Sequence, residues 1–253
     1  MKQLKLYIAV TLMVMAVGLA YATDFKAESL NYKVLYKWGL VNKTAGRATL
    51  SLRPTSSVYH VKLTARTEPW ADHVYHLRDT LTSTMNKQTL LPTRYEKIAR
   101  EDGKYGKDIV EFTYSGNTVL GKCTRYRKGK KDSEVKTSKT SLSASGETFD
   151  MLSVFYYIRS IDFNGLGNGK SRVVNIFSGK KKETLTVTYK GLEQISVAGQ
   201  KRNTYHVTFT FTNNGSKSSE PINAWLSADE RVIPLKVEGQ LKIGKVIVEY
   251  TGG

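Results

Sequence analysis

Histidines and acidic side chains are the residues best suited to chemistry in this chain, and their spacing favours a structural role. The four histidines are His60, His73, His76 and His206. On a strand, His73 and His76 would point to opposite faces, which separates them as metal ligands. Asp72 and Asp79 near these histidines suggest an acid–base set, but Arg78 beside Asp79 is better explained by ion pairs and turn contacts. We therefore expect no metal site and no cofactor.

Sequence motifs of the common enzyme classes are missing. The chain contains no G-x-S-x-G, no phosphate loop with its lysine, no H-E-x-x-H and no paired cysteines. The glycine-rich stretch 165–169 lacks the spacing of a dinucleotide fingerprint, so it is interpreted as a flexible connector. The lone Cys123 fits a small core residue better than a reactive thiol. We expect a protein that is not an enzyme.

Arg159 is the charged residue with the most unusual setting. It ends a strongly apolar stretch that also contains Asp150, Tyr156 and Tyr157. A buried guanidinium needs an anion, either a protein carboxylate or the headgroup of a ligand. The simpler alternative is that Arg159 interacts with the helix C-terminus or pairs with Asp79 or Asp162.

The first 22 residues are typical of a secretory signal peptide. Lys2 and Lys5 precede an apolar run over 6–19, and residues 20–22 form an A-x-A cleavage site. Cleavage would remove two of the 39 basic residues and none of the 22 acidic ones, so the net charge falls from +17 to +15. Because Cys123 is far from the cleavage site, the expected product is a free periplasmic protein and not a lipoprotein. No later apolar run is long enough to span a membrane, and no nucleic-acid motif accompanies the basic charge.

Alternation of apolar and polar residues dominates the rest of the chain. It occurs in the segments 30–38, 59–65, 110–114, 185–189 and 205–211. Each predicts a strand with one buried face, and the short turn signals between them predict an antiparallel meander. The segment 233–243 keeps one apolar parity through Gly239 and predicts a long bent strand, which is typical of curled sheets and barrels. One helix, over 149–161, is expected to be buried against the sheet because its apolar arc is wide.

These patterns predict a mainly β protein, with a curled antiparallel sheet or a partly open β-barrel and one central buried α-helix. The signal peptide would occupy 1–22, and a single domain 23–253 would have two halves, about 23–145 and 162–253, joined by the helix 149–161. Between 122 and 139 the net charge is +6, and this segment with the Ser/Thr-rich 138–145 is interpreted as the end of a strand that runs into a long mobile loop. Its basic-surface candidates are Arg125, Arg127, Lys128, Lys130 and Lys131.

Several segments together resemble a family of exported bacterial proteins of Gram-negative envelopes known only as a domain of unknown function. The matching segments are 30–39, 45–48, 75–79, 91–95, 150–159, 224–229 and 233–238, which cover most of the mature chain in order. The resemblance implies no activity. More distantly, Trp225 followed by a turn and Pro234 is similar to periplasmic lipoprotein carriers, which implies an incomplete barrel with helices over an apolar cavity.

Two functional hypotheses follow from these observations. The first is a non-catalytic periplasmic module that binds or carries an apolar or amphiphilic envelope ligand, such as a lipid. Its ligand-binding candidates are Tyr36, Trp38, Arg78, Asp79, Asp150, Tyr156, Tyr157, Arg159 and Trp225. The alternative is an envelope assembly or glycan-interacting protein that uses its basic surface on anionic polymers.

Overall fold

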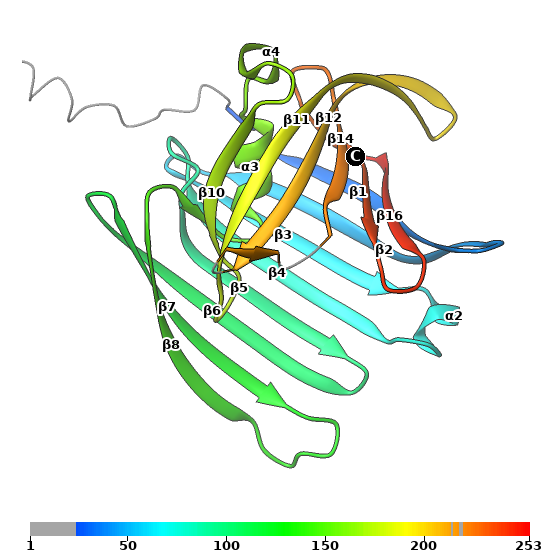
Figure 1. Ribbon diagram of the computed structural model, residues 1–253. Coiled ribbons are helices and arrows are strands. Elements are labelled where there is room, and N and C mark those ends of the chain that lie inside the picture. The colour runs from blue at the N-terminus through cyan, green and yellow to red at the C-terminus, as the bar shows by residue number, and fades with distance from the viewer. Residues whose placement is uncertain (1–23, 214, 218–219) are drawn as a thin grey trace, which may run out of the picture.

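The strands of the protein form one continuous sheet that curls into a nearly closed barrel, and all neighbouring strands in it are antiparallel except the terminal pair β9 and β10. The computed structural model describes residues 24–213, 215–217 and 220–253. Within these residues the sheet has 16 strands in the order β8-β7-β6-β5-β4-β3-β2-β1-β16-β15-β14-β12-β11-β10-β9, with β13 paired to β12. The path runs from β8 at one edge to β9 at the other, so one seam remains between the two ends (Figure 1). The expectation of a mainly β, partly open barrel is confirmed.

Long strands and a few short helices make up the described residues. The strands are β1 (Glu28–Trp38), β2 (Val41–Pro54), β3 (Val58–Thr67), β4 (Leu77–Asn86), β5 (Pro92–Glu101), β6 (Lys104–Ser115), β7 (Thr118–Lys128), β8 (Lys136–Ser145), β9 (Thr148–Phe149), β10 (Ser171–Phe177), β11 (Lys182–Val197), β12 (Gln200–Asn213), β13 (Ser216–Lys217), β14 (Ile222–Ser227), β15 (Pro234–Gln240) and β16 (Lys245–Gly252). The helices are α2 (Pro69–Asp72), α3 (Ser153–Arg159) and α4 (Phe163–Leu166). None of the described helices has the length and apolarity that a membrane-spanning helix requires.

The alternating pattern of the sequence decides which face of each strand points inward. On β3, Tyr59 and Val61 are buried while His60 and Lys62 are exposed. The inward residues of β1 to β7 meet those of β10 to β16 in one core around α3. The core therefore fills the end of the barrel at which α3 lies, hereafter the helix end (Figure 1).

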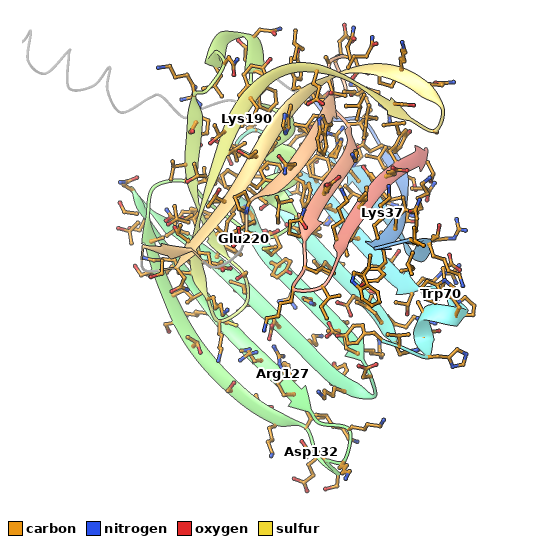
Figure 2. The ribbon with its side chains drawn as sticks, turned by 45° about the vertical axis from the view of Figure 1, so that its right-hand side comes forward. Lys37, Trp70, Arg127, Asp132, Lys190 and Glu220 are labelled. Atoms are coloured by element: carbon orange, nitrogen blue, oxygen red, sulfur yellow. The ribbon has the colours of Figure 1, made fainter. Side chains whose placement is uncertain are left out.

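At the seam, the two edges of the sheet meet through a few specific contacts. Asn175 on β10 donates from its backbone to Glu147 O and from its side chain to Ser145 O, both at 2.9 Å. The ring of Phe177 is fully buried and stacks on Phe112 of β6 with centroids 5.6 Å apart. Away from these contacts β7 and β8 diverge from the other half of the barrel, and Figure 2 shows Arg127 and Asp132 at this open end.

The single long helix expected over 149–161 is not confirmed. Phe149 belongs to β9, and α3 has seven residues, of which all but Phe155 are buried. The helix starts late because Asp150 forms a turn before it: its Oδ1 accepts from the backbone N–H of Leu152 at 2.6 Å and of Ser153 at 2.9 Å. Two four-residue helices, α2 and α4, were not expected.

Asp150 makes the stability of the fold pH-dependent. Its side chain is fully buried, and burial raises the pKa of this carboxyl from 3.8 to about 6, while Ser83 and the backbone N–H groups hold it lower than burial alone would. The unfolded chain therefore loses the proton at lower pH than the folded one. The contribution of Asp150 to the free energy of unfolding should fall by about 3 kcal/mol as the pH rises from about 4 to about 6, and then stay constant.

The variant Asp150→Asn replaces the carboxylate Oδ1 by an amide oxygen that can accept the same backbone hydrogen bonds, and its side chain does not titrate. Urea unfolding of both proteins between pH 4 and 7.5 should show that the wild-type free energy falls relative to that of the variant across this range. If the difference in free energy of unfolding between the two proteins stayed constant with pH, the raised pKa of Asp150 in the folded protein would be contradicted.

Two other expected segments differ from the structure. The apolar parity over 233–243 does not produce one long strand, because β15 ends at Gln240 and Leu241 and Ile243 lie exposed in a turn. In the basic segment 122–139 the expected strand end is present, because β7 extends to Lys128, but the expected long loop is short, because β8 begins at Lys136. β8 lacks an apolar pattern because it forms an edge of the sheet, where most of its side chains face water.

Candidate functional site

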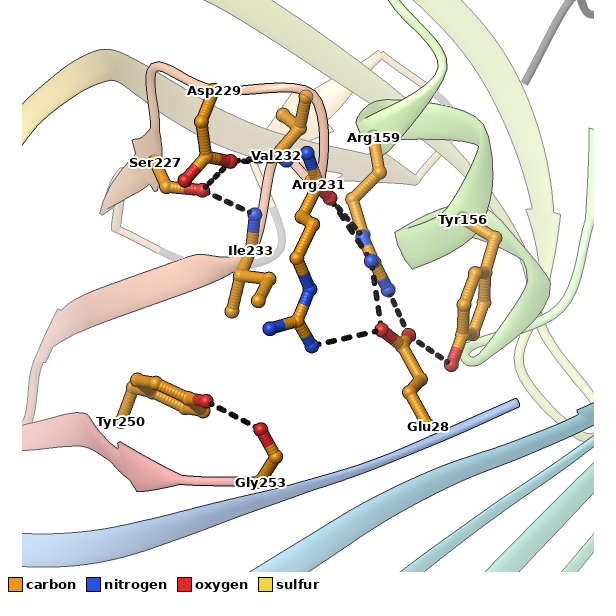
Figure 3. Close-up of polar contacts among 10 residues, drawn as sticks. All are labelled: Glu28, Tyr156, Arg159, Ser227, Asp229, Arg231, Val232, Ile233, Tyr250 and Gly253. Atoms are coloured by element: carbon orange, nitrogen blue, oxygen red, sulfur yellow. Dashed lines mark hydrogen bonds and ion pairs between the residues drawn. The ribbon is translucent and has the colours of Figure 1, made fainter. Parts of the chain in front are cut away.

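A buried ion pair joins β1 to α3 at the helix end of the barrel. The guanidinium of Arg159 contacts both carboxylate oxygens of Glu28, through NH1 to Oε1 and through NH2 to Oε2 at 3.1 Å (Figure 3). Only 2% of the Arg159 side chain and 9% of the Glu28 side chain are exposed. Arg159 also donates from Nε and NH2 to the carbonyl oxygen of Arg231 at 3.2 and 3.0 Å. The pair thus ties together three parts of the chain that are distant in sequence.

Aromatic rings surround this ion pair. The guanidinium of Arg159 lies 4.9 Å from the ring centroid of Phe25 and 5.0 Å from that of Tyr156. The hydroxyl of Tyr156 donates to Glu28 Oε1 at 3.3 Å. Arg159 therefore uses a protein carboxylate as its anion, and the expected partners Asp79 and Asp162 are wrong. The partner Glu28 could not be identified from the sequence because 131 residues separate it from Arg159.

The loop between β14 and β15 positions Arg231 beside the pair. Asp229 Oδ1 accepts from Ser227 Oγ at 2.7 Å and from the backbone N–H of Arg231 at 3.0 Å and of Val232 at 3.2 Å. Val232 has a φ of 46°, which lets the chain reverse before Ile233. The loop is thereby fixed with the Arg231 guanidinium 3.7 Å from Glu28 Oε2 and partly open to solvent.

Next to this loop lies a cavity of about 510 Å³, hereafter the rim pocket. Its walls come from the turn of the β11–β12 hairpin, the β14–β15 loop and the end of β16. Among its lining residues are the apolar side chains of Val197, Ile233, Leu235 and Tyr250 and the basic side chains of Lys201, Arg202 and Arg231. Figure 3 shows Arg231 and Ile233 on the loop across from Tyr250 of β16.

The electrostatics of the rim pocket favour an anion. Its acidic lining residue, Asp229, is already engaged by the hydrogen bonds of its own loop. Lys201 has no carboxylate within ion-pair distance in the described chain, and Arg202 donates to Gln200 Oε1 at 2.7 Å. The ring of Tyr250, which lines the pocket, contacts that of Tyr32 with centroids 5.8 Å apart. Apolar lining residues together with uncompensated basic side chains are suited to a ligand that has both an acidic and an apolar part.

Two buried side-chain polar atoms of the described residues have no hydrogen-bond partner, and one of them is the hydroxyl oxygen of Tyr32. Tyr32 is 8% exposed, and burial raises the pKa of its phenol above the usual value. The other atom is Asp79 Oδ1. Burial raises the pKa of Asp79 even though its Oδ2 pairs with Lys97 at 3.1 Å.

The structure distributes the ligand-binding candidates over separate places. Arg78 and Asp79 point to opposite faces of β4: Arg78 pairs with Asp72 at 2.7 Å outside the barrel, and Asp79 pairs with Lys97 inside it. Their interpretation as ion-pair residues is confirmed. Tyr156 and Arg159 alone of the nine candidates join in one cluster with Glu28.

The remaining candidates lie in three further environments. Tyr36 donates to the carbonyl oxygen of Ile243 at 3.1 Å, and Trp38 at the end of the same strand is 58% exposed. Tyr157 packs on Phe149 with centroids 4.7 Å apart, in the core near Asp150. Trp225 stacks on His206 at 4.9 Å, on a face away from the core. A ligand-binding role for these residues stays a prediction.

The basic-surface candidates separate in the same way. Arg125 and Arg127 both pair with Asp108, at 3.0 and 2.6 Å, on the inner side of the sheet. They are therefore not free surface charges. Lys128 ends β7, and Lys130 and Lys131 are exposed in the loop that follows.

Cys123 and the side chains that can bind metals are possible sites of chemistry among the described residues. The Cys123 thiol is buried, and burial raises its pKa, which keeps it protonated. Within residues 24–213, 215–217 and 220–253, no three acidic, histidine or cysteine side chains are grouped as a metal site would require.

The sequence patterns did not identify the residues of the rim pocket as a site. Lys201, Arg202 and Arg231 stand in or beside turns, where single basic residues are common and carry little information. The turn signal at Ala198 and Gly199 located the hairpin correctly, but it did not indicate that the hairpin would lie against the β14–β15 loop.

Comparison with known proteins supports the fold and a family. Residues 31–251 match a family model described as a protein of unknown function, DUF3108. The crystal structure of a β-barrel-like protein of the domain of unknown function DUF1849 from Brucella abortus superposes with a TM-score of 0.60 at 10% sequence identity. The alignment covers 90% of this chain and 97% of that one, and at this identity it shows the fold alone. No curated protein matches the chain.

Proposed function

Since the chain belongs to the DUF3108 family of proteins of unknown function, we propose its role from its geometry. The proposed function is that of an exported, non-catalytic binding module that holds an anionic amphiphile in the rim pocket. The observation that carries this proposal is the combination of Val197, Ile233 and Leu235 with three basic side chains around one cavity.

The size of the rim pocket agrees with this class of ligand. A volume of about 510 Å³ lies within the range of small-molecule sites, which is about 300–1,000 Å³. Burial of apolar ligand atoms against Val197, Ile233 and Leu235 would favour binding by about 25 cal/mol per Å² of area removed from water. Arginine and lysine at the entrance would hold a carboxylate or phosphate headgroup by charge-assisted hydrogen bonds.

The absence of catalysis is proposed because the perturbed groups are occupied by structural contacts. Asp150 holds the turn before α3, and Asp79 pairs with Lys97. Neither residue lines the rim pocket. A binding role needs none of these groups to transfer a proton.

Export to a periplasm-like compartment is the part of the proposal that rests on the sequence. The basic start, apolar run and A-x-A site of residues 1–22 support it. This location would expose the rim pocket to envelope lipids, whose acidic headgroups and acyl chains match its two kinds of lining residue.

Direct binding of a fluorescent fatty acid and of its ester tests the ligand class. The mature chain should bind a dansyl-labelled fatty acid and should bind its neutral methyl ester at least tenfold more weakly. The variant Lys201→Gln/Arg202→Gln should lower the affinity for the acid by about tenfold, because each charged contact at an exposed site contributes up to about 1 kcal/mol. The ester should be unaffected by the change.

The matched control is Lys180→Gln/Lys181→Gln, which removes the same charge from the exposed β10–β11 turn. It should leave binding of the acid unchanged. If both double variants weaken binding equally, or if acid and ester bind equally well, the rim pocket is not the site of an anionic amphiphile.

A further inference from the structure

Four arginines stand directly opposite one another across neighbouring strands on the outer face of the sheet. Arg47 of β2 pairs in register with Arg66 of β3, Arg66 with Arg78 of β4, and Arg78 with Arg100 of β5. Lys33 of β1 stands opposite Arg47 and extends the row. Since adjacent strands are about 4.8 Å apart, the four arginines span about 14 Å.

Such a row is unfavourable in the protein by itself. Like charges directly opposite on a sheet repel each other and lower stability. Two of the arginines have carboxylate partners at the strand ends: Arg47 pairs with Glu68 at 2.6 Å and Arg78 with Asp72 at 2.7 Å. Lys33 likewise pairs with Glu249 at 2.9 Å.

Arg66 and Arg100 are left uncompensated. Neither has a carboxylate within ion-pair distance in the part of the chain that the structure describes, and both are exposed. The guanidinium of Arg100 lies 5.7 Å from the ring of Tyr105, its partner on β6. One strand separates Arg66 from Arg100, so two free positive charges are held about 10 Å apart.

The same row borders a second cavity, of about 410 Å³, hereafter the arginine groove. Its lining includes all four arginines together with Asn31, Thr49, Thr64 and Thr80 from the adjacent row of the same face. Thr49 donates to Asn31 Oδ1 at 2.9 Å, whereas the hydroxyls of Thr64 and Thr80 make no hydrogen bond with the described residues. The groove therefore presents guanidinium groups beside free hydroxyls.

We propose that the arginine groove binds a segment of an acidic polysaccharide, with Arg66 and Arg100 each holding an acidic group of the chain. Guanidinium groups bind carboxylates or sulfates in a bidentate fashion, and threonine and asparagine side chains exchange hydrogen bonds with sugar hydroxyls. A linear polymer can follow a row of charges that crosses four strands. Such a polymer would contact only side chains on the outer face of the sheet.

Other polyanions fit this groove less well. The lining residues offer no exposed aromatic ring on which a nucleobase could stack, because Tyr32 is buried. They also offer no large apolar side chain that could enter a lipid layer. The proposal uses none of the basic residues of the β7–β8 loop and does not depend on the function proposed for the rim pocket.

The test compares binding of polygalacturonate, which has a carboxylate on each sugar, with binding of neutral dextran. The mature chain should bind the acidic polymer at low salt and lose it as ionic strength rises, and it should not bind dextran. Arg66→Gln/Arg100→Gln should weaken binding by about tenfold, because two exposed charged contacts are lost. The control Lys180→Gln/Lys181→Gln removes the same charge at a distant turn and should change binding less than twofold.

The thermal stability of the variants shows whether weaker binding results from the loss of a ligand contact or from unfolding of the protein. Because Arg66 and Arg100 have no carboxylate partners, their replacement relieves repulsion, and the Tm should be unchanged or higher. Equal losses in both double variants would overturn the proposal, since net charge alone would then explain binding. It would also be overturned if the arginine variant kept its affinity for polygalacturonate but lost binding to vesicles of phosphatidylglycerol.

Discussion

Arg159→Met is expected to lower the free energy of unfolding by about 3–5 kcal/mol, among the largest effects of any single change in this protein. The substitution removes the guanidinium that contacts both oxygens of Glu28 and leaves that carboxylate in a nearly dry environment. It also leaves the carbonyl oxygen of Arg231 without its two donors. Urea unfolding at pH 7 measures the loss.

The double variant Arg159→Met/Glu28→Leu separates the loss of the ion-pair attraction from the cost of leaving the Glu28 carboxylate buried without a partner. Replacing both partners by apolar residues leaves no buried carboxylate, so most of the lost stability should return. Arg231→Gln serves as the control, because this side chain is 52% exposed and lies 3.7 Å from Glu28. It should cost less than about 1 kcal/mol. A cost below about 1 kcal/mol for Arg159→Met itself would show that the pair does not hold β1 to α3.

Phe177→Ala is expected to cost about 3–5 kcal/mol and to loosen the seam of the barrel. The ring is fully buried between the two edges of the sheet and stacks on Phe112. It also covers Gly121 of β7, where an added Cβ would lie 2.6 Å from the Phe177 ring. Loss of the ring removes apolar contacts of β10 with both β6 and β7.

The close approach at Gly121 gives a second readout. Gly121→Ala alone should destabilise the protein by about 1–3 kcal/mol, because the new methyl group overlaps the Phe177 ring. Combined with Phe177→Ala, the same methyl group would enter the cavity left by the ring, so the double variant should lose less stability than the sum of the two single losses. Val173→Ala on the same strand is 60% exposed and should change stability by less than about 0.5 kcal/mol.

Hydrogen exchange locates the effect of Phe177→Ala. Amides of β8 and β10 should exchange faster in the variant than in the wild-type protein, while those of β1 and β16 keep their protection. Uniform loss of protection over the sheet would mean that the seam is not an independent opening unit.

Much of the fold follows from local sequence patterns and could therefore be predicted. Side chains on a strand alternate between two faces, so the alternation over 59–65 or 205–211 identifies a half-buried strand without knowledge of its neighbours. Short turns between such strands allow little but antiparallel pairing. Where the alternation is missing, as in β8, the strand was missed because hydrogen bonding to β7 places it in the sheet.

The candidate site was less predictable because its contacts join distant residues. A wide apolar arc correctly indicated that Tyr156 and Arg159 are buried, and a buried arginine requires an anion. Which carboxylate approaches it depends on where β1 crosses α3, and no residue spacing in the sequence indicates where the two elements cross. The rim pocket is likewise formed by two turns and the end of β16, which are adjacent only in space.

The sequence by itself determined that this protein is a β-rich domain with inward apolar faces and short antiparallel connections, because those properties follow from neighbouring residues. Only the tertiary structure decided the partners of its charges. The register of β2 to β5 aligned Arg47, Arg66, Arg78 and Arg100, while the register of β6 and β7 placed Arg125 and Arg127 on Asp108. Coulomb energy depends on the distances between side chains across strands, and these distances are fixed only when the sheet has formed.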